Sequence, residues 1–119
     1  YYQNTQIFPI MHVVGIKKDL VSQYPWLPAS LYKAFEEARK IALQAILDTS
    51  ASKVTIPLID EQIDFVHKEL GPELWTYGFH NNRHVIDKFL EYHHVQCLSS
   101  RLLDAEELFH PSSMESYSL

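Results

Sequence analysis

The sequence of 119 residues is poor in cysteine and in positive charge, and it has no long apolar run. Its single cysteine, Cys97, excludes an internal disulfide and any metal site built from several thiolates. No apolar stretch approaches the length that a helix needs to cross a bilayer. The formal net charge of -5 argues against a nucleic acid or an anionic membrane as partner, because both attract clustered Lys and Arg. A small anion remains compatible, since it needs only one or two well-placed cations.

The apolar and charged contents, 46% and 21%, are those of an ordinary globular protein. We find no repeat, low-complexity block or interdomain linker, so residues 1–119 are predicted to form a single compact unit. The Ser-rich end, residues 111–119, is expected to be a flexible tail. Because no methionine or leader precedes Tyr1, we expect the chain to be the C-terminal portion of a longer protein.

The pattern of apolar residues predicts a mainly helical α+β fold, with four or five helices and one or two strands. Met11–Ile16 is the best strand candidate, following Pro9, which cannot donate a ladder hydrogen bond. Cys97 is expected to pack half-buried just beyond a helix. The predicted helices cover residues 17–21, about 25–47, about 59–70, about 82–96 and about 104–108.

Local signals support these helices. Asp104 and Glu107 have the spacing of a capping box, and Gly71 stands where a helix end favours glycine. Steps of three and four residues predict one apolar stripe on the long helix, made of Leu31, Phe35, Ala38, Ala42 and Ala45 or Ile46. The buried face of the helix over 82–96 is expected to contain Val85, Ile86, Phe89, Leu90 and His93.

Seven histidines raise the question of a metal site. His80 and His84 are four residues apart, which is a usable half-site for zinc on a helix. However, His80 falls at or before the expected helix start, and no carboxylate completes a pattern such as H-E-x-x-H. We therefore interpret these histidines as solvated surface residues and predict no metal site.

Four separated segments occur together in one order, namely Tyr1–Val14, Tyr24–Pro28, Leu31–Phe35 and Tyr77–Arg83. In this combination the chain resembles the C-terminal part of the 4,5-dihydroxyphthalate decarboxylase family, whose members are similar to type 2 periplasmic solute-binding proteins. The resemblance implies a two-lobed fold in which the opening strand crosses between the lobes and the helices cover their outer faces. The missing N-terminal part would supply most of both sheets.

The resemblance also implies an activity. It points to a cytoplasmic carboxy-lyase of phthalate degradation that converts 4,5-dihydroxyphthalate to 3,4-dihydroxybenzoate and CO2. This loss of CO2 needs a proton at the carbon that carries the carboxylate and electron push from the para hydroxyl. A well-placed acid and base supply both, so no cofactor is expected.

Five residues are site candidates on this reading. His12 is the proposed catalytic acid or base, since a histidine can donate and accept protons near neutral pH. Arg83 is the candidate for binding the retained carboxylate through its two-pronged guanidinium. Asn82, Tyr1 and Tyr2 are further candidates for contact with the aromatic acid.

Each of these residues also has a structural interpretation. His12 could be an ordinary strand histidine, and Arg83 could pair with Asp87 four residues later. Asn82 fits a helix N-cap, and the two tyrosines fit a core or hinge pair. For the whole protein, the alternatives are a periplasmic solute-binding protein for uptake of a small organic anion and a helical interaction module. A homo-oligomer is compatible with the decarboxylase and with both alternatives.

Overall fold

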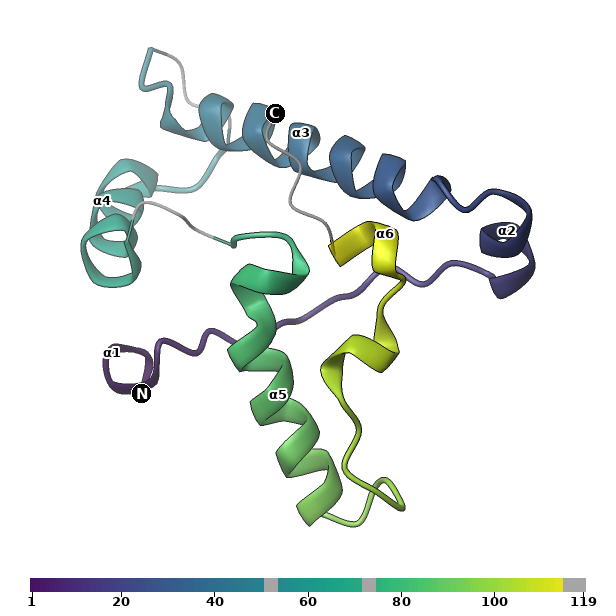
Figure 1. The fold of residues 1–119 in the computed structure, drawn as a ribbon. Helices are drawn as coiled ribbons and strands as arrows, with labels where there is room; N and C mark the ends of the chain where they lie inside the picture. Colours follow the sequence, from purple (N-terminus) through teal and green to yellow (C-terminus); the bar gives the residue numbers. More distant parts are fainter. Residues whose placement is uncertain (51–53, 72–74, 115–119) are drawn as a thin grey trace.

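The structure is a computed structural model that describes residues 1–50, 54–71 and 75–114. Six α-helices and one short 3-10 helix make up the regular structure of these ranges (Figure 1). They are α1 (Tyr2–Thr5), α2 (Lys18–Gln23), α3 (Leu27–Leu47), α4 (Ile59–Leu70), α5 (Phe79–Val95), η1 (Ala105–Leu108) and α6 (Pro111–Met114). The prediction of a mainly helical chain is confirmed. No helix within the described ranges has both the length and the apolar character that a bilayer span requires.

The predicted strand over Met11–Ile16 is wrong, because the described residues contain no strand. Instead, residues 6–17 form an irregular segment that runs from α1 to α2 (Figure 1). Met11 and Val13 are 66% and 75% exposed. A strand exists only when a neighbour pairs with its peptide groups, and the described part of the chain offers none to residues 8–16.

The long helix α3 begins and ends close to its predicted bounds. Pro28 lies in its first turn and is buried there, where the missing N–H costs no helical hydrogen bond. The apolar stripe does not face a core, however. Phe35, Ala38, Ala42 and Ile46 are all exposed, whereas Leu31 and Ala45 are half-buried.

Helix α4 has the predicted bounds, and Gly71 follows it at φ 89°. The start of the chain is attached to its last turn. The Tyr2 hydroxyl donates to the Leu70 carbonyl oxygen at 3.0 Å. The Gln3 side-chain amide donates to a carboxylate oxygen of Glu69 at 2.7 Å. The chain start and the end of α4 are therefore neighbours, although more than sixty residues separate them.

A small core lies where α5 meets η1 and α6. Buried Phe79, Ile86, Leu90 and Ala105 form its centre, against which Leu103, Phe109 and Met114 pack. The rings of Phe79 and Phe109 are 5.3 Å apart. The predictions for Val85, Ile86 and Leu90 are confirmed, whereas Phe89 is 61% exposed and His93 only half-buried. Cys97 is also exposed, against expectation, in a left-handed conformation just after α5.

The predicted capping box is confirmed at the start of η1. The Asp104 carboxylate accepts a hydrogen bond from the Glu106 N–H at 3.0 Å. The Glu107 carboxylate accepts one from the Asp104 N–H at 3.0 Å. Two backbone donors that a helix start leaves free are thereby satisfied, which stabilises the start of η1.

Gly78, immediately before α5, has a backbone that only glycine tolerates, with φ 100° and ψ 152°. A Cβ atom at this position would lie 2.7 Å from the Tyr32 hydroxyl oxygen. We therefore expect Gly78→Ala to lower the free energy of unfolding of the full-length protein by about 1–3 kcal/mol. Urea unfolding measures this change. Ser100→Ala, at an exposed position after α5, is the control; equal effects of the two variants would contradict the prediction.

Candidate functional site

The start of α5 carries two of the five candidate residues, Asn82 and Arg83. Gly78 occupies the N-cap position, so the helix begins three residues earlier than expected and Asn82 is not its cap. Instead, the Asn82 side-chain amide donates to the carbonyl oxygens of Thr76 and Gly78, at 2.7 and 2.9 Å. Asn82 therefore ties the aromatic loop before α5 to the first turn of the helix.

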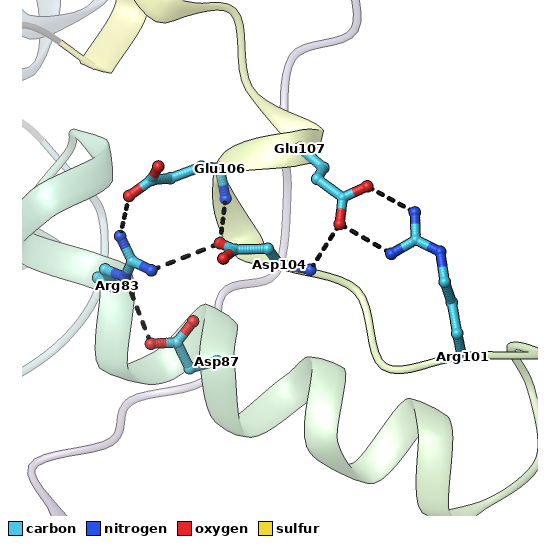
Figure 2. A network of polar contacts seen from close by, with 6 residues as sticks. All are labelled: Arg83, Asp87, Arg101, Asp104, Glu106 and Glu107. Atoms are coloured by element: carbon cyan, nitrogen blue, oxygen red, sulfur yellow. Dashed lines mark hydrogen bonds and ion pairs between the residues drawn. The ribbon is translucent and has the colours of Figure 1, made fainter.

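Arg83 lies one residue further along, among three carboxylates (Figure 2). Its guanidinium is 3.5 Å from Asp87 and 3.4 Å from Asp104, and it donates a hydrogen bond to Glu106. The hydrogen bond that Arg83 donates to the Glu106 carboxylate is the main cause that raises the pKa of Arg83. The predicted pair with Asp87 is present, but it is one part of a larger network that joins α5 to η1.

This network borders an open groove of about 400 Å3. Arg83 is 38% exposed there, beside Asp87 and Asp104, and Glu91 contributes another carboxylate. Leu102 and Leu103 provide the apolar part of the lining. As it stands, the groove holds more negative than positive charge. An anionic ligand would therefore have to displace carboxylates from Arg83 before it could bind there.

A second ion pair supports the same corner of the molecule (Figure 2). Arg101 donates to both carboxylate oxygens of Glu107, at 2.8 and 2.5 Å. These hydrogen bonds are the main cause that lowers the pKa of Glu107 to about 2. The pair and the capping box share this one carboxylate, so its charge holds the loop before η1 in place.

The lowered pKa of Glu107 predicts a pH dependence of stability. An unfolded glutamate has a pKa of about 4.3, so the contribution of Glu107 is fully present above that pH and is lost as the pH falls towards about 2. We expect Glu107→Gln to lower Tm near pH 7 and the gap to the wild type to close towards pH 2. Thermal unfolding of the full-length protein at a series of pH values measures the difference in Tm. Glu37→Gln, at an exposed position on α3, is the control; a constant gap for Glu107→Gln would refute the assignment.

A third group of charged and aromatic side chains joins α3 to the loop before α5. Arg39 donates to both carboxylate oxygens of Glu36, at 3.0 and 2.6 Å, and the two side chains are only 11% and 14% exposed. The Arg39 guanidinium carbon lies 5.7 Å from the centre of the Tyr77 ring. Burial raises the pKa of the neighbouring Tyr32, while the Arg39 hydrogen bond lowers that of Glu36.

Sequence reasoning did not assign any role to this group. The spacing of Glu36 and Arg39, three residues apart on a helix, predicts an ion pair. Nothing in the local sequence indicated that the pair would be largely buried or that Tyr77 would lie over it. The contact fixes the aromatic loop from one side, and Asn82 fixes it from the other.

The other three candidates lie apart from the start of α5. His12 is exposed in the middle of the irregular segment between α1 and α2. Tyr1 is exposed at the start of the chain, and the Tyr2 hydroxyl is bonded to Leu70. Within the described ranges, no contact joins His12, Tyr1 or Tyr2 to Asn82 or Arg83. A site that uses all five residues would therefore need further elements to bring them together.

His80 and His84 are both exposed on α5, in agreement with the surface interpretation. His84 has a structural contact, since its Nε2 lies 2.9 Å from the Gln6 carbonyl oxygen and so holds the chain start beside α5. No group of three or more His, Cys, Asp or Glu side chains in the described ranges is placed to hold a metal ion.

No family model matches the chain. A comparison with curated proteins finds a relative that is similar over the whole chain. All 119 residues align, at 47% identity, with a protein of Comamonas testosteroni named 4,5-dihydroxyphthalate decarboxylase. The chain is homologous to the C-terminal part of a 4,5-dihydroxyphthalate decarboxylase. The predicted relationship is thereby confirmed, and the chain spans 36% of the length of this relative.

Proposed function

We propose that the longer protein to which this chain corresponds is a 4,5-dihydroxyphthalate decarboxylase, which releases CO2 and forms 3,4-dihydroxybenzoate. The observation that carries this proposal is the 47% identity to a decarboxylase over every residue of the chain. The enzyme would act in the cytoplasm on an aromatic dianion and would need no organic cofactor. The net charge of -5 does not oppose such a substrate, because its recognition depends on a few local cations.

His12 is the proposed proton-transfer residue. During the reaction, the bond between the ring and one carboxylate breaks, and its electron pair stays on the ring carbon. That carbon gains a proton, while the para hydroxyl loses one and donates electron density to the ring. His12 would supply the proton to the carbon, and a base elsewhere in the complete site would take the hydroxyl proton and return it to the oxygen once CO2 has left. Its exposed position leaves the imidazole accessible to a substrate.

Arg83 is the proposed anchor for the carboxylate that remains. Its guanidinium borders an open groove, and hydrogen bonds to a planar carboxylate suit its two-pronged geometry. Binding would require the substrate carboxylate to replace at least one of Asp87, Asp104 and Glu106, whose side chains are all exposed. Asn82 would position the turn beside Arg83, and Tyr1 and Tyr2 would lie against the aromatic ring.

The irregular segment supports the proposed two-lobed solute-binding architecture. Its apolar side chains Phe8, Ile10, Met11, Val13 and Val14 are exposed. In the described part of the chain, peptide groups 8–16 lack hydrogen-bond partners. A segment with both properties is stabilised by joining a sheet, because the sheet satisfies the peptide groups and covers the side chains. In the complete protein, this segment would be the strand that crosses between the lobes and carries His12.

The proposal is tested by incubating the purified full-length protein with 4,5-dihydroxyphthalate. We expect CO2 and 3,4-dihydroxybenzoate to form in equal amounts without added metal or cofactor. Chromatography of the aromatic product and trapping of CO2 measure both. Tight binding of the dicarboxylate without any release of CO2 would instead favour the uptake alternative.

The 119-residue chain by itself is expected to be inactive. The groove at Arg83 has three carboxylates and a single cation in its lining, and no described contact joins His12 to Arg83. Catalysis requires reacting groups at close distance in a defined geometry. The same CO2 assay checks this expectation, and turnover by the isolated chain would show that it contains the complete site.

A further inference from the structure

Helix α3 exposes the apolar side that an amphipathic helix normally buries. We define the α3 stripe as Phe35, Ala38, Ala42 and Ile46, which follow one another at steps of three and four residues and so share one side of the helix. All four are exposed, Phe35 to 45% and Ile46 to 39%. In a complete domain, such a stripe faces the core.

In the first turns of α3 the same side of the helix is covered, because Pro28 is buried and Leu31 is half-buried there. Polar and aromatic contacts lie along one flank of the stripe. Tyr32 lies against Gly78, and the Glu36–Arg39 ion pair lies under the Tyr77 ring. The described chain therefore covers the start of this side of α3 and leaves the part from Phe35 to Ile46 exposed. Its contacts within the chain do not explain why the stripe is apolar.

The chain as a whole exposes more surface than a compact domain of the same mass. The accessible surface is 9235 Å2, whereas a folded protein of 13.9 kDa normally exposes about 6,700 Å2. The radius of gyration is 17.2 Å, compared with about 13.5 Å for a compact domain of this length. The excess surface exceeds the area that a standard protein interface buries in total, roughly 1,600 Å2.

We propose that the α3 stripe is an interface with the rest of the longer polypeptide, the part that corresponds to the unmatched portion of the relative. Nearly two thirds of that relative lies outside the match, which is enough chain to form the missing surface. The partner surface is apolar. Ala38 and Ala42 allow its backbone to approach α3 closely, and Phe35 and Ile46 fill recesses on either side. This interface depends on the family relationship and not on the decarboxylation chemistry.

Thiol labelling of the full-length protein tests the proposal. In a Cys97→Ser background, Ala42→Cys places a thiol on the stripe. Gln44→Cys places one at an exposed position about 200° around the same helix. Labelling with N-ethylmaleimide is followed at each site by peptide mass spectrometry. We expect Cys at position 42 to react at least about tenfold more slowly than Cys at position 44, because a buried thiol reacts only after local opening.

Equal labelling rates at the two positions would overturn the proposal. Protection that disappears when the protein is diluted to monomers would also overturn it, since the cover would then be a second copy. If Ala42→Cys prevents accumulation of folded protein, Ala38→Cys is compared with Gln44→Cys in the same way. CO2 release is measured separately, so protection in a protein without decarboxylase activity would reject the proposed reaction and retain the interface.

Discussion

His12→Ala in the full-length protein is expected to lower kcat by about a hundredfold or more, with little change in the affinity for 4,5-dihydroxyphthalate. A residue that transfers a proton acts in the transition state, and loss of general acid or base catalysis typically has this magnitude. Steady-state kinetics gives kcat, and equilibrium binding of the substrate to the inactive variant gives its affinity. The exposed position of His12, on the segment proposed to cross the cleft, is the structural basis.

His80→Ala is the matched control, because it removes an exposed histidine on α5 that has no proposed role in the reaction. Its kcat is expected to stay within a factor of two of the wild type, as for a neutral surface substitution. A near-normal kcat for His12→Ala would mean that His12 is an ordinary residue of the segment. The decarboxylation would then need a proton donor from the remaining part of the protein.

Elements that depend on neighbouring residues alone were predictable from the sequence. Helix α4 has the predicted bounds, because the periodicity of its apolar residues and Gly71 at its end are local signals. The capping box of Asp104 and Glu107 is equally local, since the side chains and backbone groups that form it lie within four residues. These elements can therefore be predicted from the sequence without knowledge of the tertiary fold.

Elements that require a distant partner could not be predicted in the same way. Met11–Ile16 has the composition of a strand, but a strand forms only where another strand pairs with it, and none is present in the described ranges. The α3 stripe was correctly recognised as apolar, but the contacts of α3 that the structure shows come from distant residues: Tyr32 lies against Gly78, 46 residues later, and Arg39 over the ring of Tyr77, 38 residues later. Both cases concern surfaces that this chain does not cover by itself.

The surroundings of Arg83 were only partly predictable. Its contact with Asp87 follows from helical spacing, and it is present. Asp104 and Glu106 approach from 21 and 23 residues away, through the packing of η1 on α5, and no local pattern indicates them. The same packing decides how far the Arg83 guanidinium is open to a ligand.

Arg83→Ala in the full-length protein is expected to raise KM by about tenfold to a hundredfold, which corresponds to the 1.5–3 kcal/mol of hydrogen bonds to a charged group. If Arg83 binds the retained carboxylate equally in the ground and transition states, its loss changes KM and leaves kcat almost unaltered. Arg83→Lys keeps the charge but lacks the planar pair of donors, so it should recover the wild-type KM only in part.

Arg101→Ala is the matched control, since Arg101 also forms an exposed ion pair in the same corner but does not line the groove. The opposing view is that Arg83 serves only to hold η1 against α5 through Asp104 and Glu106. On that view, Arg83→Ala and Arg101→Ala both leave KM unchanged. Both also lower the stability only slightly, because an exposed ion pair contributes little to it. A rise of KM in Arg83→Ala alone, with partial recovery in Arg83→Lys, would place this guanidinium on the substrate. It would also show that the substrate replaces the carboxylates that occupy it in the structure described above.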